Sequence, residues 1–206
     1  MPELLSGLII EVPEAEPAVG ELRMRLDRVA SLGVPAHVTA LFPFVAAASI
    51  DADLLERIAE VARASGPFDY LFSRTAWFGD DVLYLAPEEP TPFRVLTARL
   101  WEAFPAYPPY GGQFADVVPH LTIGEGAGRD ALLDAERSVR AYGPVTGRAE
   151  RLTLMVQTRG GRWSYRGREN VRRLTPANPG RASTDRGTTS GHHAFGPSRS
   201  VVRRGP

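Results

Sequence analysis

The stretch Ala36-His-Val-Thr-Ala-Leu-Phe42 decides the fold prediction, because its pattern recurs in Val117-Val-Pro-His-Leu-Thr-Ile123. In both, a histidine precedes a threonine by two residues inside an apolar run, which is typical of a β-strand. Residues i and i+2 of a strand point to the same face, so imidazole and hydroxyl would lie about 6.6 Å apart. A histidine can transfer a proton near neutral pH, and a threonine hydroxyl can donate a hydrogen bond to a phosphoryl oxygen. Two such units facing one groove would suit phosphate chemistry.

The two tripeptides could also be ordinary strand residues, because threonine is common in strands and a buried histidine needs only a hydrogen-bond partner. Threonine makes up 12 of the 206 residues. A chance match at one position therefore has a probability of roughly 6%. Matches at both histidines that lie outside the C-terminal segment favour the functional interpretation.

The composition indicates a globular protein, since 43% of the 206 residues are hydrophobic, enough for one sizeable core or two small lobes. The absence of cysteine excludes disulfides, thiolate metal sites and a cysteine nucleophile. Residues 1–11 lack a basic leader and a cleavage site, and no apolar stretch approaches the roughly 20 residues that span a bilayer. We therefore expect a cytoplasmic protein with no membrane contact. We also expect it to be a monomer.

Hydrophobic periodicity predicts a mixture of strands and helices, and their order suggests two related halves. The expected strands are residues 4–12, 36–42, 68–78, 82–86, 117–123, 151–157 and 162–165. The expected helices are residues 17–32, 51–64, 91–104 and 129–142, with Asp51 and Thr91 as N-caps. We expect Val29 and Tyr142 on the buried faces of their helices. Residues 105–114 form a loop rich in Pro, Gly and Tyr.

The C-terminal segment differs in composition from the rest of the chain. From residue 175 it consists mainly of Pro, Gly, Ser, Thr and Arg, and it cannot bury enough surface to offset the entropy of ordering. We expect a globular domain over residues 1–174 and a disordered tail over residues 175–206. The pair His192-His193 could bind a metal and the tail arginines could attract nucleic acid, but a solvated tail without a site is favoured.

The paired tripeptides, with the stretches Trp77–Pro87 and Tyr107–Gly112, resemble the 2H phosphoesterase superfamily, in its branch of 2′-5′ RNA ligase-like proteins and RNA 2′,3′-cyclic phosphodiesterases. The resemblance covers roughly residues 3–167. It implies an α+β fold with two pseudo-symmetric lobes, each an antiparallel sheet with helices packed outside, and a central groove between them. It assigns the groove a first motif, His37 and Thr39, and a second motif, His120 and Thr122.

The same resemblance implies an RNA-processing hydrolase that opens 2′,3′-cyclic phosphates of RNA ends or nucleotides, and that can run in reverse as a 2′-5′ RNA ligase. Water must attack phosphorus in line with the departing oxygen, so a base and an acid must flank the phosphoryl group. We assign the acid to His37 and the base to His120, two roles that are nearly interchangeable. The threonines would hold the non-bridging oxygens, with no metal or other cofactor.

Tyr110 and Phe42 are the expected substrate-binding residues, because a nucleobase stacks on an exposed aromatic ring. Three further rings lie near the motifs, Phe44, Trp77 and Tyr107, and for these core packing is favoured over a stacking role. Arginines that could clamp a phosphate, if they are not simply solvated, are Arg74, Arg159 and Arg162.

Two alternatives stay open at this point. Residues 1–150 carry 12 Arg against 22 acidic residues, and the remainder has the opposite balance, so the substrate could be a small nucleotide, such as a cyclic ADP-ribose phosphate. The protein could also bind RNA ends or phosphates without catalysis. Other enzyme classes lack support, since the sequence has no Gly-x-Ser-x-Gly elbow, no lysine for a phosphate-binding loop and no His-Glu-x-x-His site.

Overall fold

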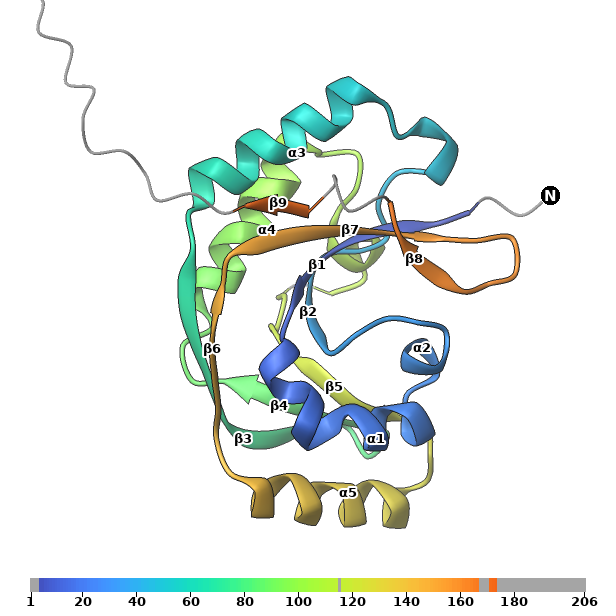
Figure 1. Ribbon diagram of the computed structural model, residues 1–206, viewed down its shortest axis with the longest axis vertical. Helices are drawn as coiled ribbons and strands as arrows, with labels where there is room; N and C mark the ends of the chain where they lie inside the picture. The colour runs from blue at the N-terminus through green and yellow to red at the C-terminus, as the bar shows by residue number, and fades with distance from the viewer. Residues whose placement is uncertain (1–3, 115, 167–170, 174–206) are drawn as a thin grey trace, which may run out of the picture.

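The computed structural model describes residues 4–114, 116–166 and 171–173, which form two antiparallel sheets with helices on their outer sides (Figure 1). In the first sheet the strand order is β2-β1-β7-β8, and β9 also pairs with β7. Its strands are β1 (Ser6–Glu11), β2 (His37–Leu41), β7 (Arg151–Gln157), β8 (Trp163–Tyr165) and β9 (Val171–Arg173). The second sheet has the order β5-β4-β3-β6, with β3 (Phe68–Phe78), β4 (Val82–Pro87), β5 (Leu121–Glu125) and β6 (Val145–Ala149). The predicted α+β fold is confirmed.

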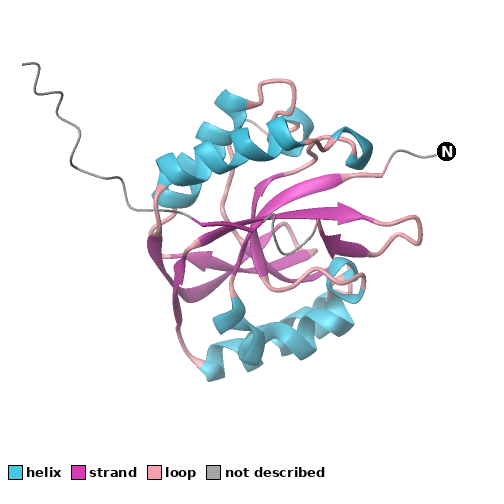
Figure 2. Ribbon diagram, turned by 45° about the horizontal axis from the view of Figure 1, so that its top comes forward, coloured by secondary structure: helices cyan, strands magenta, loops and turns pink. Residues whose placement is uncertain are grey.

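The helices lie above and below the strands in Figure 2 and form two packed groups. In the first group, α3 (Ala52–Ser65) packs on α4 (Thr91–Ala103), and the two contact β9 and β2 of the first sheet. In the second, α1 (Glu16–Leu26) packs on α5 (Arg129–Tyr142), and the two contact β5 and β3 of the second sheet. The short helix α2 (Arg28–Ser31) follows α1, and 3-10 turns occupy Pro13–Ala15, Ala47–Ser49 and Pro109–Gly112.

The two lobes exchange segments, so neither is a continuous half of the sequence. Helix α1 connects two strands of the first sheet but packs against β5 of the second. Strands β6 and β7 are separated only by Glu150, yet they belong to different sheets, as their continuous path in Figure 1 shows. The predicted pseudo-symmetry thus holds for the element types, whereas burial of each sheet depends on elements from both parts of the chain.

Alternation along the strands separates core residues from groove residues. On β1, Leu8 and Ile10 are buried in the main hydrophobic core, and their neighbours Gly7 and Ile9 face a hollow between the sheets. Gly7 leaves room there for the Phe42 ring, because a Cβ atom at residue 7 would lie 3.0 Å from Cδ2 of that ring. The period-two pattern therefore leaves one face of the first sheet for a site.

The predicted helix over residues 17–32 is wrong in its second half. Asp27 has extended backbone angles, φ −123° and ψ 110°, and ends α1. Its carboxylate accepts the backbone N–H of Val29, which starts the separate helix α2. Val29, predicted to be buried, is 36% exposed. An aspartate that caps a new helix outweighed the apolar spacing, which by itself is continuous through this region.

Smaller corrections concern caps and boundaries. Thr91 is the first residue of α4 and not its cap; its N–H donates to the Glu89 carboxylate instead. Tyr142 is 53% exposed because it lies in the last turn of α5, beyond the sheet. Strand β5 begins at residue 121, four residues later than predicted, and β6 was not predicted because its sequence contains glycine and arginine.

Other elements match the prediction closely. Helix α5 and strand β7 have the predicted bounds, and Asp51 caps α3 by accepting the Leu54 N–H at 2.8 Å. Within the described ranges, no helix is long and apolar enough to cross a bilayer. The predicted tail over residues 175–206, with His192 and His193, lies outside the described residues.

Candidate active site

The two His-x-Thr motifs meet where the edges of the two sheets approach each other. His37 is the first residue of β2, and His120 immediately precedes β5. These strands are the edge strands of their sheets, and they contact one another. The exchange of helices between lobes keeps the two edges together, since α1 packs on β5 and α4 on β2. The fold therefore brings together two tripeptides that lie 83 residues apart.

Two adjoining hollows receive these side chains. The first has a volume of about 160 Å³ and is lined by His37, Thr39 and Thr122, among others. The second has a volume of about 430 Å³ and is lined by His120 and again by Thr122. Glu125 also lines both hollows. Because they share two lining residues, the hollows form one groove that contains all four residues predicted as catalytic.

Both imidazoles are oriented by the same backbone contact. Nδ1 of His37 lies 2.8 Å from the carbonyl oxygen of Pro35, and Nδ1 of His120 lies 2.8 Å from that of Val118. A carbonyl oxygen only accepts hydrogen bonds, so Nδ1 carries the proton and donates it in each ring. The other nitrogen, Nε2, is left to accept or donate a proton in the groove.

His37 sits in the more strongly perturbed environment. Burial lowers its pKa to about 4, and the positive charge of Arg23 adds to the decrease, as does His120. The hydrogen bond to Pro35 acts in the opposite direction. The electrostatic influence of His120 on His37 is consistent with two rings that face a common space. His37 is therefore neutral at neutral pH.

His120 is held by aromatic rings instead of a cation. Its ring makes edge-to-face contacts with Phe78 at 4.9 Å and with Tyr84 at 5.4 Å between centroids. Burial lowers the pKa of His120, and this decrease is opposed by its hydrogen bond to Val118 and by the negative charge of Glu125. His120 is thus easier to protonate than His37.

The two predicted substrate-binding residues both lie in the groove, one in each hollow. Phe42 lines the first hollow and packs edge-to-face on Trp163 at 5.9 Å. Tyr110 lines the second hollow and packs on Phe114 at 5.7 Å. Tyr110 adopts a left-handed backbone conformation, φ 51°, and its N–H donates to the carbonyl of Phe42 at 2.6 Å. This contact ties the Pro-rich loop to the end of β2.

The Tyr110 hydroxyl also connects this loop to the first motif. It forms a hydrogen bond with the Thr39 side chain. Burial raises the pKa of Tyr110, and the hydrogen bond to Thr39 offsets only part of this increase. The phenol consequently stays protonated at neutral pH and remains a hydrogen-bond donor. No corresponding phenol interaction is observed for Thr122 among the described residues.

The remaining candidates from the sequence do not line either hollow. Phe44 is buried and packs with Phe104 and Tyr107 in the core. Trp77 points to the helix side of its sheet, where its Nε1–H donates to Glu136 on α5. Arg74, Arg159 and Arg162 are also absent from the lining, and Arg74 lies 3.9 Å from Glu88.

Sequence reasoning missed several residues that line the groove. They are the aromatic residues Phe78, Phe114 and Trp163 and the acidic residues Asp27, Asp116 and Glu125. Phe78 was recognisable in part, since it pairs with Val82 across the predicted hairpin and shares its face. The described lining residues of the two hollows include no arginine, but arginines outside the lining pair with two of the carboxylates, Arg23 with Asp27 and Arg94 with Asp116.

In the described part of the chain, no group of three or more His, Asp or Glu side chains could hold a metal ion. The predicted independence from metals stays a prediction, because it concerns the reaction itself. The groove itself offers two imidazoles, two alcohols and one phenol.

The fold resembles several solved structures at low sequence identity. Crystal structures of E. coli LigT complexed with NADP⁺ (15% identity; 85% of this chain, 99% of LigT) and of TT0787 from Thermus thermophilus (14%; 84% and 100%) each give a TM-score of 0.52. A crystal structure described as a phosphoesterase gives the same TM-score at 15% identity, covering 84% of this chain and 99% of that one. The comparison with curated proteins found no match.

The sequence itself matches one family model. The model of the 2′-5′ RNA ligase superfamily matches residues 11–161, a span that contains both motifs and both edge strands. This match covers more than half of the chain and agrees with the shared fold. The chain belongs to the 2′-5′ RNA ligase superfamily, that is, to the 2H phosphoesterases.

Proposed function

We propose that this protein is a phosphoesterase that opens 2′,3′-cyclic phosphates by acid–base catalysis with two histidines. The observation that carries the proposal is the matched pair of imidazoles on the facing sheet edges, each donating from Nδ1 to the carbonyl two residues earlier. Nε2 of each ring is then available to one phosphoryl group between them. Family membership supports an enzyme of this general class.

The surroundings of the rings favour His37 as the base and His120 as the acid, the reverse of the assignment from sequence. The base must be neutral, and burial with the nearby Arg23 favours neutral His37. The acid must be protonated; burial lowers the pKa of His120 as well, but its hydrogen bond to Val118 and the negative charge of Glu125 oppose that decrease. In the forward reaction, His37 takes a proton from water while water oxygen bonds to phosphorus, and His120 protonates the ribose oxygen as its bond to phosphorus breaks.

Thr39, Thr122 and Tyr110 are the proposed donors to the non-bridging oxygens. Both threonines line the first hollow, and Tyr110 lies next to Thr39. Fixed hydroxyl donors stabilise the negative charge that increases on these oxygens in the transition state. The left-handed conformation of Tyr110 fits this role, since strained residues often occur at functional sites.

The groove favours a single nucleotide or a short RNA end as substrate. Its rings offer stacking surfaces, the Glu125 carboxylate can accept hydrogen bonds from base amino groups, and no arginine among the described lining residues offers a site for additional phosphates. LigT, which shares the fold, has been crystallised with 3′-AMP and with NADP⁺. A small nucleotide carrying a cyclic phosphate is therefore the favoured class, and an RNA oligomer with a cyclic end is the second candidate.

A substrate panel tests this function. The full chain is incubated with 2′,3′-cyclic mononucleotides and with an RNA oligomer ending in a cyclic phosphate, with and without a chelator, and products are followed by ³¹P NMR. We expect one phosphomonoester product, unchanged by the chelator, with faster turnover of the small substrates. The His37→Ala/His120→Ala variant is the control for contaminating activity.

The same panel addresses a binding module without catalysis. If nucleotides bind the groove but no product forms over many hours with any cyclic phosphate, the catalytic proposal is wrong and a binding function replaces it. Addition of a 5′-hydroxyl RNA strand to the 2′,3′-cyclic-phosphate-ended oligomer tests ligation, in which the 5′-hydroxyl replaces water as the nucleophile. Formation of a 2′-5′ linkage would identify the ligase direction.

A further inference from the structure

Arg23 is the largest side chain that is fully buried in the described part of the chain, at 2% exposure, and it lies beside the proposed base. Its partner is Asp27, one helical turn later and 3% exposed. Nε and Nη2 of Arg23 donate to Oδ2 of Asp27 at 3.2 and 2.8 Å. Burial of a charged pair is costly, and apolar residues of similar size are often equally stable in such positions. Stability alone therefore does not account for this pair.

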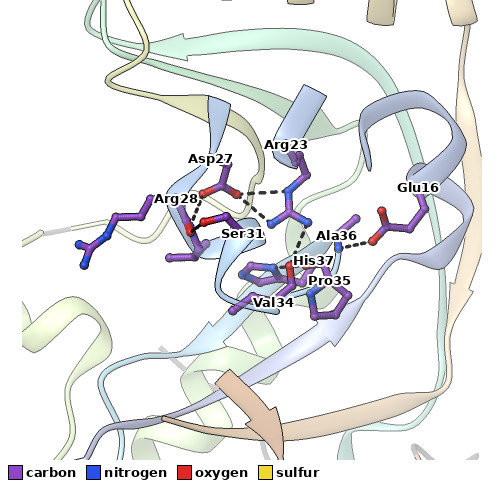
Figure 3. Close-up of polar contacts among 10 residues, drawn as sticks. Glu16, Arg23, Asp27, Arg28, Ser31, Val34, Pro35, Ala36 and His37 are labelled. Carbon is purple, nitrogen blue, oxygen red and sulfur yellow. Dashed lines mark hydrogen bonds and ion pairs between the residues drawn. The ribbon is translucent and has the colours of Figure 1, made fainter. Parts of the chain in front are cut away.

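The pair contacts the segment that leads into His37. Nη1 of Arg23 donates to the carbonyl oxygen of Val34 at 3.4 Å, and Figure 3 shows the guanidinium pointing toward this segment from α1. The next carbonyl, that of Pro35, holds Nδ1 of His37. The N–H of Ala36 donates to Glu16, which lies two turns before Arg23 on α1. Helix α1 therefore fixes the backbone of residues 34–36 at two points.

Asp27 has a second contact that reaches the groove. Its Oδ1 accepts the Val29 N–H and caps α2, and its side chain lines the hollow that contains His37. The pair thus joins the end of α1, the start of α2 and the beginning of β2 at the wall of the proposed site. The corresponding i,i+4 pair on α5, Arg140 with Glu136, lies on the outer side of the second sheet with Arg140 65% exposed.

We infer that the buried Arg23–Asp27 pair is the positioning unit of His37: it fixes the backbone that orients the ring and places a guanidinium charge beside the imidazole. The inference rests on the proposed function for its catalytic consequence only. Arg23 does not line either hollow, so it acts through His37 and not on the substrate.

Among the described residues, three other ionisable side chains lie near His37. His120 faces it from the second sheet and also disfavours its protonated form. Glu11 pairs with residue 37 across β1 and β2, but its carboxylate accepts hydrogen bonds from Thr153 and Tyr165. Glu125 lines the same hollow from β5. Arg23 and Asp27 carry opposite charges, so removing one or the other should shift the pKa of His37 in opposite directions.

The test is an NMR titration of His37 in the full-length chain, with Arg23→Gln, Asp27→Asn and Arg23→Lys. Arg23→Gln removes the positive charge and should raise the pKa of His37 by about one pH unit. Asp27→Asn leaves the guanidinium uncompensated and should lower it further. Arg23→Lys keeps the positive charge, so the pKa of His37 should stay low. Arg140→Met is the matched control and should leave His37 unchanged.

The outcomes separate a specific role from general packing. If both Arg23→Gln and Asp27→Asn move the pKa of His37 in the same direction, or if Arg23→Gln leaves it unchanged in a folded protein, the inference is wrong. Should the single variants fail to fold, the neutral double variant Arg23→Met/Asp27→Leu takes their place; it removes both charges, so the expected increase is smaller and comes from the loss of the dominant guanidinium charge. No change in that variant would equally overturn the inference.

Kinetics connect the pair to catalysis and keep the two proposals distinguishable. With Arg23→Gln, the acid limb of kcat/KM for a 2′,3′-cyclic nucleotide should move up by about one pH unit, with little change at pH 7. If the wild-type protein hydrolyses no cyclic phosphate but His37 titrates as expected, the proposed function fails and the inference stands. If hydrolysis occurs and His37 does not respond to Arg23, only the inference fails.

Discussion

The two His-x-Thr motifs share their local geometry but not their surroundings. Each ring donates from Nδ1 to the carbonyl two residues earlier, and each threonine lies in the same groove. Around His37 lie the buried Arg23–Asp27 pair and the phenol of Tyr110 next to Thr39. Around His120 lie two aromatic rings and the exposed carboxylate of Glu125.

The difference shows how a duplicated motif can supply two different chemical roles. Local geometry determines which nitrogen faces the groove, and it is the same in both motifs. Burial lowers the pKa of both rings, and the nearby charges then act in opposite directions: Arg23 lowers the pKa of His37 further, and Glu125 opposes the decrease at His120. Asymmetric surroundings on a symmetric scaffold therefore favour one base and one acid.

The largest expected effect comes from the histidines. His37→Ala and His120→Ala should each lower kcat/KM for a 2′,3′-cyclic mononucleotide by about 10²- to 10⁴-fold, since each removes a proton-transfer group. A nucleoside p-nitrophenyl phosphodiester separates their roles, because nitrophenolate departs without a proton. We expect that substrate to restore turnover in His120→Ala but not in His37→Ala. Restoration in the opposite variant would reverse the assignment, and near-normal turnover by both on the cyclic substrate would disprove the mechanism.

Substitution of the threonines should lower turnover less than substitution of the histidines, and the two threonine variants should differ from each other. Thr122→Val should lower kcat by about 10²-fold through the loss of one donor. Thr39→Val should cost less, on the order of tenfold, because the Tyr110 hydroxyl beside it can still donate. The double variant Thr39→Val/Tyr110→Phe should then match Thr122→Val in single-turnover kinetics. Equal effects of the two single threonine variants would remove Tyr110 from this role.

The pH dependence should sharpen the contrast further. The base His37 must be neutral, so kcat/KM should rise with pH through about 4. The acid His120 must be protonated, so kcat/KM should fall above its lowered pKa, by about tenfold for each pH unit beyond it. The optimum should therefore lie below pH 6.5. Glu125→Gln should move the alkaline limb to lower pH; movement to higher pH would contradict the role given to this carboxylate.

The smallest expected effect concerns stacking in the second hollow. Phe114 is 61% exposed and packs on Tyr110, so Phe114→Leu should raise KM about fivefold with little change in kcat. Trp101→Leu on α4 is the control, since that ring is also exposed but lies outside both hollows. Equal KM changes in both variants would show that no base stacks on Phe114.

Sequence patterns predicted the regular elements well where local periodicity is strong. Helix α5 and strand β7 have the expected bounds because their buried positions repeat with an unbroken helical or strand period. The pattern failed at Asp27, where a side chain that caps one helix and pairs with Arg23 interrupts an apolar spacing that looks continuous. Caps and ion pairs depend on three-dimensional partners, which spacing does not encode.

The sequence by itself determined the catalytic candidates, because the two-residue spacing within a strand places each imidazole and its threonine on one face. It also determined the aromatic candidates Phe42 and Tyr110, which both reach the groove. Only the tertiary structure decided that Arg23 lies beside His37, that Phe78 supports His120 and that Tyr110 meets Thr39. These contacts join segments brought together by the exchange of helices and strands between lobes, so no local rule of spacing could predict them.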